Sequence, residues 1–181
     1  MTMASSRRFL DGLSRLSAQQ WLLRAAAPAG AVVVLLLERG AGGTVQPWFA
    51  AVVLGQALFV ASLPDSGGGL VLVLLLGVHW AMFVPEAVSG WVLGAAMTLL
   101  GMHLGAALAS YGPPSLVLRP ALLQRWARRG LLVAGATVLV WLAARLWPSA
   151  HGSGAGWASG AALLVLLVWT LRLTRMLGPR R

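Results

Sequence analysis

Long uncharged apolar stretches, separated by clusters of arginine, constrain this chain more than any other feature of its sequence. Twelve of the fourteen arginines fall in three segments, at residues 7–24, 119–129 and 172–181. Basic residues that flank transmembrane helices stay on the cytoplasmic side of the membrane. The pattern therefore predicts an integral membrane protein and also predicts which way it is oriented.

Composition excludes several classes of protein. With 59% apolar and only 10% charged residues, the chain has too little polar surface to cover a water-soluble fold. The net charge of +10 is confined to the ends of apolar segments, where it suits topology and anionic headgroups, so we predict no nucleic-acid partner. Cysteine is absent, which removes disulfides and cysteine-ligated metal sites.

Six helical spans are predicted within one membrane domain, residues 21–181. They cover residues 21–37, 47–63, 69–84, 87–109, 131–147 and 157–173. Several of these spans are slightly shorter than the roughly 20 residues that a full crossing needs, so two of them could be re-entrant or tilted segments. An even number of spans puts both termini on the same side of the membrane. With the arginine-rich segments in the cytoplasm, that side is the cytoplasm, and only Arg39 and Arg145 lie outside. The chain has no lysine, and its richness in arginine, alanine, glycine and leucine is typical of GC-rich coding, which suggests a bacterium. The expected fold is an all-α, polytopic bundle in a bacterial cytoplasmic membrane.

Two segments are predicted to lie at the cytoplasmic surface. Residues 1–20 form a basic, amphipathic leader, for which an N-terminus without regular structure is the alternative. Residues 112–130 form an interfacial segment, in which a short helix from Pro120 carries Leu122, Leu123 and Trp126 on one side. The arginines of both segments are expected to contact anionic lipid or an acidic partner; they are Arg7, Arg8, Arg15, Arg119, Arg125, Arg128 and Arg129.

Small residues form a stripe along the fourth predicted span. At about 100° per residue they fall within a face roughly 80° wide. The spacing between Gly101 and Gly105 is the one that lets helix backbones approach closely. Packing within the chain and packing against another chain are both open. The predicted helix-packing residues are Gly90, Gly94, Thr98, Gly101 and Gly105.

Three intramembrane polar residues, Gln56, His79 and His103, are candidate functional residues because burying an unpaired polar group in lipid is costly. The predicted depths of the two histidines differ by roughly 12 Å, which argues against a shared metal ion, and no cofactor is predicted. One interpretation is a ladder that passes protons, since histidine titrates near neutral pH. The other is that each histidine bonds to the backbone of a neighbouring helix.

Charged residues on the outer face are expected to pair and close the bundle there. They are Glu38, Arg39, Glu86, Arg145 and His151. No serine or threonine nucleophile with a positioned base stands near the two carboxylates in the sequence, and no phosphate-binding loop or zinc-protease motif is present. The sequence therefore predicts no enzymatic activity.

Two short motifs carry a resemblance. Pro64-Asp65-Ser66 ends the second predicted span, and the pair His79-Trp80 lies in the third. With these motifs and its overall hydropathy, the chain resembles the small, uncharacterised multi-spanning membrane proteins of high-GC Gram-positive bacteria. The resemblance implies a multi-pass membrane protein and supplies no catalytic residue.

The function expected from the sequence is that of a non-catalytic integral membrane protein. It would act as an accessory or structural subunit that packs against another membrane protein or against itself. The alternative is a small transporter or proton-linked channel, with Gln56, His79 and His103 along the path.

Overall fold

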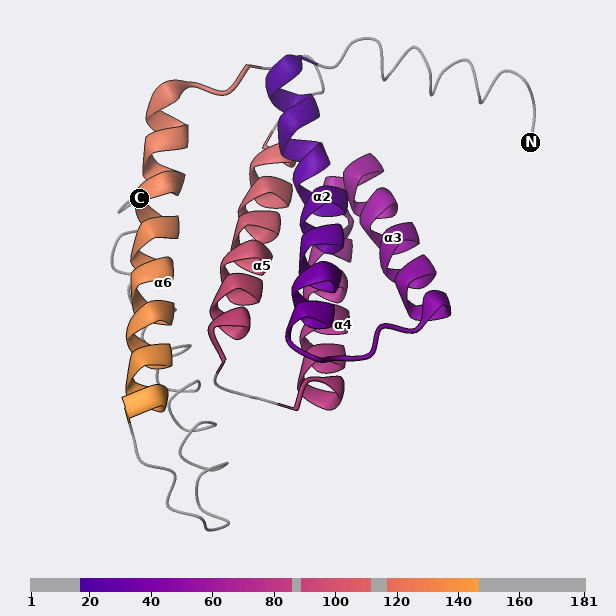
Figure 1. Cartoon of the computed structure of the whole chain (residues 1–181). Helices are drawn as coiled ribbons and strands as arrows, with labels where there is room; N and C mark the ends of the chain where they lie inside the picture. Colours follow the sequence, from indigo (N-terminus) through magenta and orange to yellow (C-terminus); the bar gives the residue numbers. More distant parts are fainter. Residues whose placement is uncertain (1–16, 86–88, 112–116, 147–181) are drawn as a thin grey trace, which may run out of the picture. The chain divides into compact units, whose positions relative to one another are not determined.

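The computed structural model describes residues 17–85, 89–111 and 117–146, and all regular structure in these residues is helical (Figure 1). This confirms the predicted all-α class for the described part of the chain. Most of the predicted leader and the whole sixth predicted span lie outside it. The elements are α2 (Ala18–Gly40), α3 (Pro47–Ser62), the 3-10 helix η1 (Pro64–Ser66), α4 (Gly68–Phe83), α5 (Gly90–Ala109) and α6 (Pro120–Leu146).

The chain divides into two compact units, residues 1–137 and 138–181. Of the second unit the structure describes residues 138–146, the last turns of α6. There the Arg145 guanidinium lies over the Trp141 ring, 5.3 Å from the ring centroid. The packing described below belongs to the first unit.

Three of the described helices, α2, α5 and α6, are long and apolar enough to cross a membrane. Helices α3 and α4 are also apolar, but each has 16 residues and is therefore only about 24 Å long. A hydrocarbon core is about 30 Å thick. These two helices match the expectation that some predicted spans are shorter than a full crossing.

Local sequence signals explain where the helices begin. The Ser17 side chain accepts a hydrogen bond from the Gln20 backbone N–H at 3.2 Å and caps α2. Pro47 and Pro120 stand at the starts of α3 and α6, where the missing N–H of proline removes no helical bond. Gly67, with φ of 67°, makes the left-handed turn from η1 into α4.

Helix α6 corrects one prediction. A short helix from Pro120 and a separate span from Leu131 were expected, but the structure has a single helix that continues through Gly130. A glycine inside a helix costs only about 1 kcal/mol. It also makes room here, because a Cβ atom at Gly130 would lie 2.7 Å from Leu104 Cδ1 of α5. The glycine that the sequence suggested as a boundary thus lies beside the Leu104 side chain of α5.

Helix α2 packs against α3, α4 and α5, most extensively against α5 (Figure 1). Leu37 of α2 lies beside Gly94, and Ala26 lies beside Gly105, so α2 and α5 run antiparallel. The buried core combines small and branched residues from four helices. They include Ala27, Ala31, Val34, Phe49, Val53, Ala57, Leu72, Leu76 and Met102.

Side-chain contacts define two ends of this unit. At the first, which we call the basic end, Arg24 of α2 meets the last residues of α3, and Gln19 accepts a hydrogen bond from the Leu118 N–H at 2.8 Å. Residues 119–129, which comprise Arg119 and the first turns of α6, follow directly and carry four arginines. The opposite end contains the last turn of α2, the loop to α3 and the last turns of α4.

Candidate functional site

The end opposite the basic end holds a buried polar cluster of Glu38, His79 and Gln46. Nδ1 of His79 lies 2.7 Å from Oε1 of Glu38, an ion-pair distance, and Nε2 lies 3.2 Å from Oε1 of Gln46. The Glu38 side chain is completely buried, and His79 is 5% exposed. The cluster joins α2, the α2–α3 loop and α4 through side chains that are remote in the sequence.

Aromatic rings shield the imidazole. The Phe49 ring stacks on the His79 ring with centroids 3.6 Å apart and an interplanar angle of 11°. Phe83 covers it at 4.4 Å and a tilt of 32°. These rings exclude water, and polar interactions are electrostatically stronger in such a low-dielectric environment. The contact between Glu38 and His79 is therefore unlike an exposed ion pair, whose contribution to stability is small.

Both imidazole nitrogens lie near an oxygen atom, Nδ1 near the Glu38 carboxyl group and Nε2 near the Gln46 side-chain carbonyl. Both carboxylate oxygens of Glu38 are buried, and neither has a hydrogen-bond partner among the described residues. In the same part of the chain no three His, Asp or Glu side chains gather as a metal site would require. The contacts of the cluster link α2, the α2–α3 loop and α4.

The loop after α2 brings Gln46 to this cluster. Gly42 adopts a φ of 81°, and the Gly43 N–H donates to the Glu38 carbonyl at 2.9 Å. A Cβ atom at Gly43 would lie 2.8 Å from Glu38 Cγ, so a larger residue would push against the buried carboxylate side chain. Two consecutive glycines thus allow the chain to turn tightly over Glu38 before α3 begins.

The three candidate polar residues lie in different surroundings. The Gln56 amide donates to the Gly68 carbonyl at 3.2 Å, at the start of α4. His79 is eleven residues further along the same helix, a rise of about 16 Å. His103 is exposed on α5. The structure therefore brings His79 together with Glu38 and Gln46 and does not bring it together with Gln56 or His103.

The small-residue stripe of α5 is divided between two surroundings. A Cβ atom at Gly105 would lie 2.7 Å from Ala26 Cβ and 3.2 Å from the Leu23 carbonyl oxygen. At Gly94 it would make ordinary contact with Leu37, whereas Gly90 and Gly101 face open space. Thr98 donates to the Gly94 carbonyl at 2.8 Å, within its own helix. Part of the stripe thus packs against α2, and part of it stays uncovered.

The described arginines of the basic end have two kinds of surroundings. The Arg24 guanidinium donates to the Ala61 and Ser62 carbonyls at 3.1 and 3.2 Å, at the last turn of α3. The remaining four, on or next to α6, are exposed except for Arg129, which is half-buried. Trp126 lies between them in sequence, and its ring packs edge-on against Tyr111 at 5.7 Å. Arg7, Arg8 and Arg15 lie outside the described residues.

Replacing Arg24 by Met is expected to destabilise the protein by about 2 kcal/mol, because two charge-assisted hydrogen bonds to the end of α3 are lost. The aliphatic stem is kept. Denaturant titration of helicity in detergent micelles measures the loss. The matched control is Arg125→Met, an exposed arginine for which a change within about 0.5 kcal/mol is expected. Equal small effects of both substitutions would contradict the capping role of Arg24.

Sequence reasoning missed two parts of the site. Glu38 was expected to pair on an outer surface, but it is buried against His79, and Gln46 was not considered. The signal that was present is the position of Glu38 and His79, each near the same predicted end of its apolar stretch. Glu86 and His151, the other members of the expected outer group, lie outside the described residues.

Comparisons of the chain with protein-family models, with curated proteins and with solved structures find no match.

Proposed function

We propose that this chain is a non-catalytic subunit of a bacterial cytoplasmic membrane, with six spans and both termini in the cytoplasm. In this proposal it packs against another membrane protein as an accessory or structural component. The observation that carries the proposal is the use of its polar side chains. Several polar side chains of the described helices connect one element of the chain to another.

Each of these connections has a structural consequence. Glu38 and His79 join α2 to α4, Gln56 joins α3 to the start of α4, and Arg24 joins α2 to the end of α3. A transporter of polar solutes needs polar groups that are available to its substrate. Polar groups that satisfy one another instead fix how neighbouring helices pack. This use of polar groups supports a structural function in the membrane and not the transport of polar solutes.

The distribution of charge supports the proposed orientation. Five of the described arginines of the first unit, Arg24 and the four between residues 119 and 129, lie at the basic end, and Arg39 lies at the end that holds Glu38. By the positive-inside rule the basic end faces the cytoplasm. The exposed arginines of α6 would then meet anionic headgroups or an acidic segment of the partner.

Of the three described helices that are long and apolar enough to cross a membrane, α6 is the least buried. Only 6% of its apolar window is buried, and Leu131, Leu132 and Val133 are among its exposed residues. Such a helix is compatible with contact to lipid and with contact to a partner helix. We assign the partner to this surface because the other long helices, α2 and α5, already pack against each other.

A small proton-linked transporter is the second candidate, and one observation favours it. Glu38 and His79 form a buried ionisable pair, and such groups inside a membrane often mark proton pathways. For this function, water in another conformation would have to connect the three candidate residues of the proton path, Gln56, His79 and His103.

Cysteine accessibility separates the two candidates, and the cysteine-free chain needs no background substitutions. Single cysteines at Gln56, His79 and His103 are treated with a membrane-impermeant thiol reagent from each side of the membrane. The accessory function predicts no labelling at these positions. Labelling of all three from water would instead support a pathway.

Two exposed loop positions serve as controls in that experiment. Thr44, between α2 and α3, should react only from outside, and Asp65, in η1, should react only from inside. The reverse pattern would contradict the proposed orientation. Reaction of both positions from the same side would contradict the crossing of the membrane by α3.

A further inference from the structure

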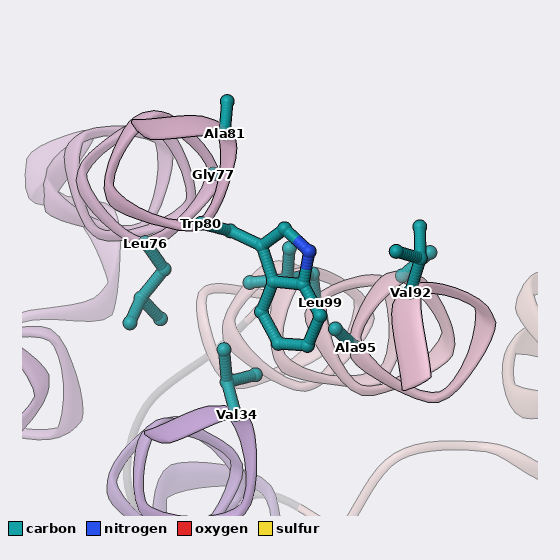
Figure 2. Close-up of a pocket in the computed structure, with 9 residues that line it drawn as sticks. Val34, Leu76, Gly77, Trp80, Ala81, Val92, Ala95 and Leu99 are labelled. Atoms are coloured by element: carbon teal, nitrogen blue, oxygen red, sulfur yellow. The ribbon is translucent and has the colours of Figure 1, made fainter. Parts of the chain in front are cut away.

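An apolar pocket of about 160 Å³ lies between α2, α4 and α5 (Figure 2). Val34 of α2, Leu76 and Trp80 of α4, and Val92 and Leu99 of α5 form much of its wall. Trp80 of the lining is the sequence neighbour of His79, but no side chain of the Glu38, His79 and Gln46 cluster lines the pocket. One side is open, where Ala81 is exposed.

Small residues create this space. The lining includes Gly77 and Ala81 of α4 and Ala95 and Ala96 of α5. A Cβ atom at Gly77 would meet no atom within 4 Å, so the glycine is not explained by a close approach of another helix. Larger side chains at these positions would close the gap. The sequence therefore leaves room here that helix packing does not use.

The size and lining of the pocket restrict what can occupy it. A closed apolar cavity of about 150 Å³ can admit a benzene-sized group, and this pocket, which is open on one side, has a similar volume. Empty space of this size forfeits the dispersion contacts that its lining atoms would otherwise make. In a bilayer, hydrocarbon is the medium around the open side, and it complements walls that carry no charge.

We propose that this pocket holds a segment of an acyl chain from a membrane lipid. The inference rests on the proposed membrane location and does not depend on a protein partner. An acyl chain is narrow and flexible enough to enter between α4 and α5 from the side. Acyl chains make up the interior of the bilayer, so their local concentration is very high and even a low affinity would fill the site.

The Trp80 indole nitrogen suggests a different occupant that the experiment can distinguish from an acyl chain. It is buried and has no hydrogen-bond partner in the part of the chain that the structure describes, and in Figure 2 it lies on the side of the ring away from Val34. An acyl chain would leave this N–H unpaired. A membrane-soluble molecule with a carbonyl or ether oxygen would pair it, and would therefore depend on the indole where an acyl chain would not.

Photolabelling from the bilayer tests the proposal. The protein is reconstituted in phosphatidylglycerol and phosphatidylethanolamine vesicles with a trace of phospholipid that carries a diazirine in its acyl chain. After irradiation, labelled peptides are mapped by mass spectrometry. Labelling is expected to concentrate at residues 76–81 and 92–99, above the level on exposed helix faces such as residues 131–133.

Gly77→Leu should fill the pocket and reduce this labelling to the level of the exposed faces. The matched control is Gly55→Leu on α3, another open glycine, which should leave the labelling unchanged. Ala96→Leu fills the pocket from the opposite wall, so the result does not depend on one variant folding. Trp80→Phe removes the N–H and should preserve the labelling.

Three results would overturn the inference, and they differ from failure of the membrane location. Labelling spread evenly over the exposed faces, or unchanged by both filling variants, would show that no chain enters the pocket. Loss of labelling in Trp80→Phe would assign the pocket to an occupant with a hydrogen-bond acceptor. Failure of the protein to enter vesicles, with no labelling on any helix, would contradict the membrane location itself.

Discussion

His79→Leu is expected to lower the free energy of unfolding by about 3 to 5 kcal/mol, because it leaves the buried Glu38 carboxylate without its partner. Glu38→Leu should have an effect of similar size for the converse reason. The measurement is loss of helicity on titration of the micelle-embedded protein with a denaturing detergent. These are the largest effects that we expect from removing a polar group in the described part of the chain.

The double variant Glu38→Leu/His79→Leu should recover most of that loss, because well-packed apolar residues often replace a buried ion pair with little change in stability. A double-mutant cycle measures the coupling between the two side chains. His103→Leu is the control, since His103 is exposed, and it should change stability by less than about 0.5 kcal/mol. Losses that simply add in the double variant would show that the two side chains are independent.

Gly105→Leu is expected to destabilise the α2–α5 pair by about 3 kcal/mol, at the upper end of the usual cost of overpacking. Its Cβ atom alone would lie 2.7 Å from Ala26 Cβ and 3.2 Å from a backbone oxygen of α2. Neither atom belongs to a flexible side chain that could move aside. The same denaturation experiment measures the loss, and proteolysis of the α2–α3 loop gives a second readout.

Gly101→Leu provides a matched control one helical turn away. Gly101 faces open space, so leucine there should be tolerated and should add up to about 1 kcal/mol through its better helix propensity. If the two substitutions had equal effects, the close approach of α2 and α5 would be contradicted. If Gly101→Leu alone disrupted a larger assembly, the uncovered part of the stripe would be identified as a contact with another protein.

Hydropathy alone predicts the first four helices well. Apolar length and flanking turns place them within three residues of the observed ends, as for 47–63 against Pro47–Ser62. The same reasoning is wrong where it divides α6. Three arginines and Gly130 were interpreted as the end of a helix, but arginine is a good helix former. Hydropathy indicates whether a segment lies in lipid or in water. It does not indicate where the backbone hydrogen bonds of a helix end.

The polar cluster was less predictable than the helices. His79 was recognised as a candidate because it is a lone ionisable residue in an apolar stretch. Its contact with Glu38 depends on how α2 and α4 approach each other, and no periodicity within either helix specifies that. Gln46 reaches His79 only because the loop turns at Gly42 and Gly43. Such contacts follow from tertiary packing, which one sequence does not reveal.

The mass of the intact complex, measured after affinity purification from native membranes in mild detergent, tests the accessory role most directly. The account predicts a second membrane protein bound in fixed stoichiometry, retained through repeated purification and lost when charged residues are placed at Leu131 and Leu132 of α6. A chain that purifies only as a monomer or as an oligomer of itself would contradict the account and favour the proton-linked transporter.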